Sequence, residues 1–255
     1  ESLLSGPAGG MVAISELVNE TKNRAIIGFD MGGTSTDVSR FENNFSYRFD
    51  TRLDGIRLNQ PMLDIETVAA GGGSICSFDG NRLRVGPKSA GAYPGPACYG
   101  NGGPLTLTDV NVYLGYVPRF PFPLDLAAVH NRMETMAERI YNVTGQRLSH
   151  SGLANGFRRI ACERMAASIR KISIARGFDT RNHTLCAFGG AGPQHACEIA
   201  ELLDINTILV HPLASVLSAR GLSVAPINVM REKPVFDIFR GRFHEEWLDT
   251  LDELA

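Results

Sequence analysis

Residues 25–41, AIIGFDMGGTSTDVSRF, constrain the fold of this chain more than any other stretch. The apolar run 25–29 predicts a buried strand, and 38–41 resumes extended character after a polar turn. Gly32 and Gly33 in that turn carry no Cβ, so their backbone N–H groups can approach phosphate oxygens closely. The stretch predicts a strand, a phosphate-binding loop and a second strand. An ordinary glycine hairpin with surface acids is the alternative.

Carboxylate and hydroxyl side chains surround this loop. Asp30 and Asp37 bracket it, and two carboxylates there would repel a bare triphosphate. The arrangement makes chemical sense if Mg²⁺ lies between the acids and the phosphates, usually through water. We therefore expect Asp30 and Asp37 to be the catalytic acids and Asp30 to be the magnesium ligand. The expected phosphate-binding residues are Gly32, Gly33, Thr34 and Ser35.

The composition limits the classes of protein to which this chain can belong. Its 255 residues suffice for one large domain or two small ones. With 25 basic and 27 acidic residues the net charge is −2, which argues against a general nucleic-acid surface and favours small-molecule substrates. We find no signal peptide or membrane-spanning run and expect a piece of a soluble protein. Five scattered cysteines without a CxxC pair favour a reducing cytoplasm.

The segments around the loop predict a helix before it and a third strand after it. Residues 1–10 are small and glycine-rich, and 11–18 have apolar residues at helical spacing, so we expect a loop and then a helix. Close helix packing explains the glycines of the first segment, with a place near a cleft as the alternative. Asn43 suits a tight turn into 45–52, which would make a third consecutive antiparallel strand.

Two acids and a triple-glycine turn follow between residues 60 and 74. Asp64, Gly72 and Gly73 are the candidates for the substrate side of a site. For Asp64 the alternative is capping of a following turn, and for the glycines it is a steric requirement of the turn itself. Both interpretations stay open at this point.

The next segments predict a hairpin, a long loop and a helix start. Asp79-Gly80-Asn81 indicates a hairpin between strands 74–78 and 82–85. Ten of the nineteen residues in 86–104 are Gly or Pro, so we expect a long loop without helix or sheet. We expect Asp109 to cap a helix and Cys98 to have a structural role.

The second half alternates helices with strands. A three-proline connector, 118–124, precedes an amphipathic helix at 125–142 with Asp125 as its N-cap. A longer helix at 151–176 has a basic face, either solvated or directed at a partner or an adenosine. Strand 184–188 enters the turn GGAGP and a helix, where exposed N–H groups can receive a phosphate or a nucleotide. We expect His195, in that helix, to be a packing or capping residue.

Five glycine-rich stretches in the same order resemble the hydantoinase A / 5-oxoprolinase family, over about residues 5–226. The family is similar to the actin, heat-shock chaperone and sugar-kinase ATPases. This resemblance implies an α/β, ribonuclease H-like, actin-type ATPase lobe with a mixed sheet flanked by helices and a glycine/proline-rich β insertion. Its expected parts are 1–117, 118–226 and 227–255. The five stretches are SGPAGG (5–10), DMGGTSTDVS (30–39), AAGGGS (69–74), AYPGPAC (92–98) and FGGAGP (188–193).

The resemblance also implies a function. The family's chemistry would be ATP-dependent hydrolysis of a cyclic amide, 5-oxoproline to glutamate in glutathione metabolism or a related lactam or hydantoin, through phosphorylation of the carbonyl. Gly189, Gly190 and Gly192 would then contact adenosine. The ATP-using subunit of a ketone carboxylase and a nucleotide-switch module without further chemistry are alternatives.

The resemblance further implies that other parts of the enzyme are needed. A first phosphate hairpin, expected in an N-terminal lobe, has no copy in this sequence, and a hydantoinase B-like domain or subunit would complete the enzyme. We therefore expect the isolated chain to bind ATP weakly and to be inactive. An amphipathic pattern at 244–254 is open to a partner or to a homo-oligomer.

Overall fold

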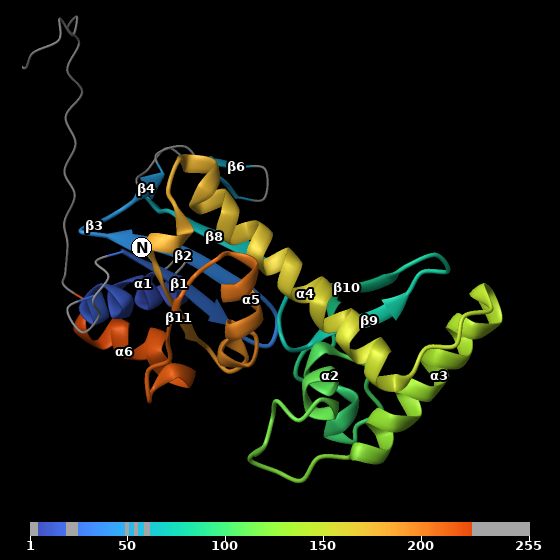
Figure 1. The fold of residues 1–255 in the computed structure, drawn as a ribbon. Coiled ribbons are helices and arrows are strands. Elements are labelled where there is room, and N and C mark those ends of the chain that lie inside the picture. The colour runs from blue at the N-terminus through green and yellow to red at the C-terminus, as the bar shows by residue number, and fades with distance from the viewer. Residues whose placement is uncertain (1–4, 19–24, 49–50, 54–55, 59–61, 226–255) are drawn as a thin grey trace, which may run out of the picture. The chain divides into compact units, whose positions relative to one another are not determined.

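The computed structural model describes residues 5–18, 25–48, 51–53, 56–58 and 62–225 (Figure 1). Contacts group Glu1–Val224 into one compact unit and Ala225–Ala255 into another. The amphipathic pattern at 244–254 lies outside the described residues. Within the described part, every helix is too short or too polar to cross a membrane.

A six-stranded mixed sheet forms the centre of the first unit. Its central strand β1 pairs in parallel with β11 and antiparallel with β2. On the far side of β11, β12 continues the parallel part, while β3 and β8 both pair antiparallel with β2. The bounds are β1 Ala25–Met31, β2 Thr36–Glu42, β3 Asn44–Phe45, β8 Ile65–Val68, β11 Thr184–Phe188 and β12 Thr207–Leu209. The sheet is mixed, as expected.

Helices cover both faces of this sheet (Figure 1). Side chains of β1 alternate between two apolar clusters, Ile27 and Phe29 in one and Ile26 in the other. A strand buried on both faces is apolar throughout, which explains the continuous run at the start of β1. The first cluster lies under α4 (His150–Ile172) and α5 (Ala196–Leu202). The second lies under α1 (Ser5–Leu17) and α6 (Leu217–Val224).

Helix α1 begins at Ser5, so the prediction of a loop over residues 1–10 was wrong for its described part. The physical reason is contact with α6. A Cβ on Gly9 would lie 2.4 Å from the carbonyl oxygen of Ser218, and one on Gly221 would lie 1.8 Å from that of Gly9. Two backbones this close exclude side chains and stabilise a helix that glycine alone disfavours. The close-packing explanation is thereby confirmed for Gly9 and Gly10, whereas a Cβ added to Gly6 would meet nothing within 4 Å.

The expected third strand is split. Asn43 adopts φ 60° in the turn as predicted, but the strand that follows has only two residues before the chain leaves the sheet. Strand β8 instead pairs along most of β2. Short two-stranded sheets lie between β3 and β8, namely β4 (Tyr47–Arg48) with β7 (Met62–Leu63) and β5 (Thr51–Leu53) with β6 (Ile56–Leu58).

The insertion after β8 contains the predicted hairpin of β9 (Ser74–Phe78) and β10 (Leu83–Ser89). β10 continues to Ser89, and Ala97–Tyr99 forms a 3₁₀ turn, so the expected loop 86–104 holds some regular structure. This segment is anchored by α2 (Leu107–Tyr113) through the buried Asp109, which accepts hydrogen bonds from the amides of Ala97, Cys98 and Thr106. The predicted capping role of Asp109 is confirmed.

Cys98 is fully buried beside this carboxylate. Burial raises the pKa of its thiol, and Asp109 adds to the shift. Because a thiol held in its neutral form is a poor nucleophile, the structural role expected for Cys98 is supported.

Two predicted helices form, the first with its predicted cap. α3 (Leu126–Thr144) begins after Asp125, whose side chain accepts from the amide of Ala128. α4 ends at Ile172, before the predicted 176. Most of its basic side chains make contacts within the protein itself. Arg158 is buried, Arg164 donates to Val85, Arg170 donates to Leu202, and Lys171 pairs with Glu66.

Candidate nucleotide-binding site

Three glycine turns that are far apart in sequence meet at the carboxyl end of β1. The amide of Gly72 donates to the carbonyl of Gly32 at 3.0 Å, and Gly73 donates to Gly33 at 2.6 Å. From the other side, the amide of Ala191 donates to Met31 at 2.9 Å. Since β1 and β11 are parallel, their turns end at the same edge, which is where α/β sheets bind ligands.

The loop at 32–35 is open to solvent. Gly33 and Thr34 are exposed, and a Cβ added to Gly33 would meet nothing within 4 Å. Among the described residues, the amides of Gly33 and Thr34 and the hydroxyls of Thr34 and Ser35 have no hydrogen-bond partner. Free donors around an unobstructed backbone form a cradle that suits phosphate oxygens.

Asp30 and Asp37 are direct cross-strand neighbours in the β1–β2 pair. Such residues point to the same face with Cβ atoms roughly 5 Å apart, and two like charges there repel each other. Burial raises the pKa of both carboxyls, and the charge of Asp37 adds to the shift at Asp30. Each carboxylate accepts one hydroxyl hydrogen bond at 2.6 Å, Asp30 from Ser218 and Asp37 from Thr67.

This carboxylate pair fits a magnesium ion. The described residues contain no group of three or more His, Cys, Asp or Glu side chains arranged around one ion. Two carboxylates beside a phosphate cradle match the usual way in which proteins bind Mg²⁺, with water and substrate phosphates as the other ligands. A cation between them would also relieve their repulsion.

The turn after β11 packs against Asp30. Gly189 has φ 77°, and a Cβ there would lie 2.4 Å from Oδ1 of Asp30. Gly192 is buried against the carbonyl of Phe29, whereas Gly190 is exposed with nothing within 4 Å of an added Cβ. Of the three residues expected to contact adenosine, Gly190 alone faces open space.

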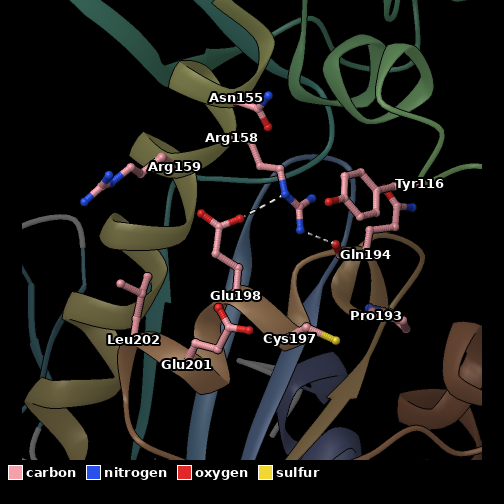
Figure 2. Close-up of a pocket in the computed structure, with 10 residues that line it drawn as sticks. All are labelled: Tyr116, Asn155, Arg158, Arg159, Pro193, Gln194, Cys197, Glu198, Glu201 and Leu202. Atoms are coloured by element: carbon pink, nitrogen blue, oxygen red, sulfur yellow. Dashed lines mark hydrogen bonds and ion pairs between the residues drawn. The ribbon is translucent and has the colours of Figure 1, made fainter. Parts of the chain in front are cut away.

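A pocket of about 790 Å³ lies beside this turn (Figure 2). Arg158 crosses it, pairing with Glu198 at 2.9 Å, donating to the carbonyl of Gln194 at 2.8 Å and lying 3.9 Å from the ring centroid of Tyr116. One buried guanidinium therefore contacts three of the residues that line the pocket. The lining residues are Tyr116, Asn155, Arg158, Arg159, Pro193, Gln194, Cys197, Glu198, Glu201 and Leu202.

His195 lies behind the turn and is fully buried. Its Nε2 is 2.9 Å from the side-chain nitrogen Nδ2 of Asn111, and its Nδ1 is 3.4 Å from Sγ of Cys162. Burial, followed by the charge of Arg158, lowers the pKa of His195 to about 3. The imidazole is thus neutral near pH 7 and packs α5 against α2 and α4, in line with the packing role expected for it.

Asp64 is not brought to this edge of the sheet. It precedes β8, whose Ile65 pairs with Ser39, whereas Val68 at the other end of β8 pairs with Thr36 beside the loop. The buried Asp64 side chain forms ion pairs with Arg48 and Arg176. The structure therefore does not support a substrate-side role. A buried carboxylate needs paired cations, and Asp64 has them.

Gly72 and Gly73, the other substrate-side candidates, belong to a turn that supports the phosphate loop. A Cβ on Gly71 would lie 2.7 Å from the carbonyl of Gly33, one on Gly72 would lie 2.7 Å from Oγ1 of Thr108, and one on Gly73 would lie 2.9 Å from the carbonyl of Gly33. The steric explanation thus accounts for these glycines. Their missing side chains allow two loops to hydrogen-bond through their backbones.

Sequence reasoning missed Ser218, Thr67 and Arg158 as parts of this region. Thr67 faces Asp37 in the register of β2 and β8, a position that an alternation pattern could have suggested once that pairing was known. Ser218 contacts a residue 188 positions away, for which no local pattern exists. Arg158 was noted only as one of several basic residues on a helix face.

A mixed α/β sheet with a glycine loop between antiparallel strands, a carboxylate pair and a second glycine turn at the same edge defines an actin-type ATPase lobe. Within this class, the chain belongs to the hydantoinase/oxoprolinase family, whose model matches residues 1–231.

Individual relatives agree with this assignment. The chain is 45% identical to 5-oxoprolinase PfmaA of Pestalotiopsis fici over 99% of this chain and 21% of the relative. The solved structure of an ATP-dependent caprolactamase from Pseudomonas jessenii superposes with TM-score 0.75 at 33% identity, covering 84% of this chain and 31% of that one. Nucleotide-free acetone carboxylase superposes with TM-score 0.76 at 26% identity, covering 86% and 32%. The chain thus spans about a fifth of the curated relative.

Proposed function

We propose that this chain is a nucleotide-binding lobe of an ATP-dependent cyclic amidohydrolase that converts 5-oxoproline to glutamate, or acts on a related lactam or hydantoin. The observation that carries the proposal is the open phosphate cradle next to the Asp30–Asp37 pair, in a chain of the hydantoinase/oxoprolinase family. Similarity to proteins named 5-oxoprolinase and caprolactamase supports a cyclic amide as the substrate.

The chemistry explains why such an enzyme would need ATP. A lactam carbonyl is a poor electrophile because its nitrogen donates electron density into it. Transfer of the γ-phosphoryl group to the carbonyl oxygen, with release of ADP, removes this protection. Water then adds to the carbon, the ring C–N bond breaks as the nitrogen takes a proton, and a second water hydrolyses the resulting acyl phosphate. Phosphoryl transfer of this kind depends mainly on positioning and charge neutralisation.

The residues at the edge of the sheet would divide this work. Gly32 and Gly33 would leave room for the phosphates, while Thr34 and Ser35 would donate hydrogen bonds to them. Asp30 and Asp37 would hold Mg²⁺, most directly through Asp30 and its coordinated water. When bound, the metal would neutralise phosphate charge during transfer.

The glycine turn after β11 would contact the adenosine. Gly190 would face it directly, because its surface is open, whereas Gly189 and Gly192 would set the shape of the turn. The pocket bordered by Pro193 and Gln194 adjoins this turn and lies within the usual size range of ligand pockets.

Further parts of the enzyme are also part of the proposal. The chain spans about a fifth of its curated relative, which is consistent with an additional N-terminal lobe and a hydantoinase B-like domain or subunit. The five cysteines are free thiols, which is consistent with a reducing cytoplasm.

The ATP-using subunit of a ketone carboxylase is a second candidate, because acetone carboxylase shares the fold of this lobe. ATP hydrolysis by the full-length protein, measured with 5-oxoproline, with hydantoins and with ketones plus bicarbonate, separates the two. We expect 5-oxoproline to stimulate hydrolysis and to yield glutamate and ADP in equal amounts. Stimulation only by ketones would favour the carboxylase, and stimulation by none would favour a nucleotide-switch module.

Replacing Asp30 with Ala tests the site within the same assay. We expect substrate-stimulated ATPase activity to fall by at least about 100-fold, because the replacement removes charge stabilisation from the transferring group. Glu138→Ala, an exposed carboxylate on α3, is the matched control and should behave like wild type. Unchanged activity in Asp30→Ala would refute the site assignment.

A further inference from the structure

The carboxylate of Asp30 is contacted by α6 directly and by the turn after β11, which is itself hydrogen-bonded to the segment just before α6. Oδ2 accepts a 2.6 Å hydrogen bond from the hydroxyl of Ser218 on α6. Oδ1 lies against Gly189, whose amide donates at 2.9 Å to the carbonyl of Ala214, just before α6. The hydrogen bond to Oδ2 therefore restricts the orientation of the carboxylate relative to the phosphate loop, while Oδ1 has no hydrogen bond from the described residues.

The position of Ser218 depends on how closely α6 approaches α1. The carbonyl oxygen of Ser218 would be only 2.4 Å from a Cβ on Gly9, and its hydroxyl only 3.3 Å from a Cβ on Gly10. Gly221 allows the same approach from the α6 side, because a Cβ there would lie 1.8 Å from the carbonyl oxygen of Gly9. Larger residues at these glycines would push α6 outward and carry the Ser218 hydroxyl away from Asp30. The glycines at the start of α1 thus have a consequence for the site, although they lie outside it.

We propose that Ser218 is a positioning residue, which orients the Asp30 carboxylate toward the metal-bound nucleotide. The close contact of α1 and α6 at their glycines places the Ser218 hydroxyl within hydrogen-bond distance of Asp30. The proposal rests on the nucleotide-binding function proposed above. A charge-assisted hydrogen bond restricts the carboxylate without occupying its second oxygen. Loss of this bond would leave the Asp30 side chain free to rotate. Metal binding by Asp30 would then be weakened but not abolished.

The test compares full-length wild type with Ser218→Ala, Ser218→Thr and Ser223→Ala. Ser223 lies on the same helix, is exposed and bonds only locally to the carbonyl of Arg220, so its replacement is the matched control. Binding of a fluorescent ATP analogue is followed by anisotropy at increasing Mg²⁺ and again at increasing Mn²⁺. Thermal unfolding without nucleotide is recorded for each variant.

For Ser218→Ala we expect the metal concentration that gives half-maximal nucleotide binding to rise about tenfold, as for loss of one hydrogen bond to a charged group. Ser218→Thr keeps the hydroxyl and should stay within about twofold of wild type, as should Ser223→Ala. Unfolding temperatures should be similar in all four proteins, which a purely structural role would not predict.

Several outcomes overturn the proposal. If folded Ser218→Ala shows the same metal dependence as Ser223→Ala, Ser218 does not position Asp30. If Ser218→Ala fails to fold, a Ser218→Thr protein that needs about tenfold more metal overturns the proposal, and one that behaves like wild type supports it. If wild type itself shows no metal-dependent nucleotide binding, both this proposal and the proposed function fail.

Discussion

The glycines at the carboxyl end of β1 fall into two groups that differ in what surrounds them. A Cβ on Gly71 or Gly189 would come within 2.7 Å of backbone or carboxylate atoms. A Cβ on Gly33 or Gly190 would meet nothing within 4 Å. We call Gly71 and Gly189 the closed glycines, because they let parts of the protein approach one another. We call Gly33 and Gly190 the open glycines, because they leave room for a ligand. The same residue type meets two separate physical needs within one site.

This difference has a consequence for reading glycine-rich motifs. The triple glycine at 71–73 and the double glycine at 32–33 look alike in sequence, and both were candidates for ligand contact. In the first motif, the amides of Gly72 and Gly73 donate hydrogen bonds to the carbonyls of the second. Among the described residues, only the second presents a free glycine amide, that of Gly33. A glycine motif indicates that another group approaches the backbone closely. It does not indicate whether that group is a ligand or another part of the protein.

The largest effect is expected for Gly189→Ala. The residue would have to adopt φ 77° and would overlap Asp30 and the carbonyl of Met31, both 2.4 Å from its Cβ. We expect the free energy of unfolding to fall by about 3 kcal/mol from the left-handed conformation and the overlap together. Chemical denaturation measures it. A stability equal to that of wild type would show that Gly189 does not belong with the closed glycines.

An intermediate effect, on binding alone, is expected for Gly33→Ala. Its Cβ has open space in the free protein, so the free energy of unfolding should stay within about 0.5 kcal/mol of wild type. The methyl group would occupy the approach of a phosphate, and we expect the dissociation constants of ATP and of tripolyphosphate both to rise about tenfold, equivalent to one lost hydrogen bond. Calorimetric titration measures both. A loss of stability without a loss of binding would reverse the assignment of this residue.

The smallest effect is expected for Gly190→Ala. It should also leave stability unchanged, and because it would meet only the adenosine side, the dissociation constant of ATP should rise by about threefold, less than one hydrogen bond. Tripolyphosphate binding should not change. This contrast with Gly33→Ala distinguishes the two open turns, and equal effects on both ligands would show that they do not contact different ends of the nucleotide.

Much of the local structure could be predicted from the sequence because its signals are local. The apolar run of β1, the Asp79-Gly80-Asn81 hairpin and the Asp125 cap all depend on neighbouring residues, and all formed as expected. The start of α1 was missed because glycine disfavours helices on its own, and only contact with α6 stabilises one there. The third strand was missed because pairing with β2 went to a distant segment, β8.

The candidate site divides in the same way. The sequence alone predicted the glycine loop, the two acids beside it, the family and the fold class. The tertiary structure decided that Gly71–Gly73 support the loop, that Asp64 pairs with arginines elsewhere, and that Ser218 reaches Asp30. The physical reason is the sequence separation between the residues that make each contact. Turn and strand preferences act between neighbours, whereas these contacts join residues 16 to 188 positions apart and exist only once helices and sheet have packed.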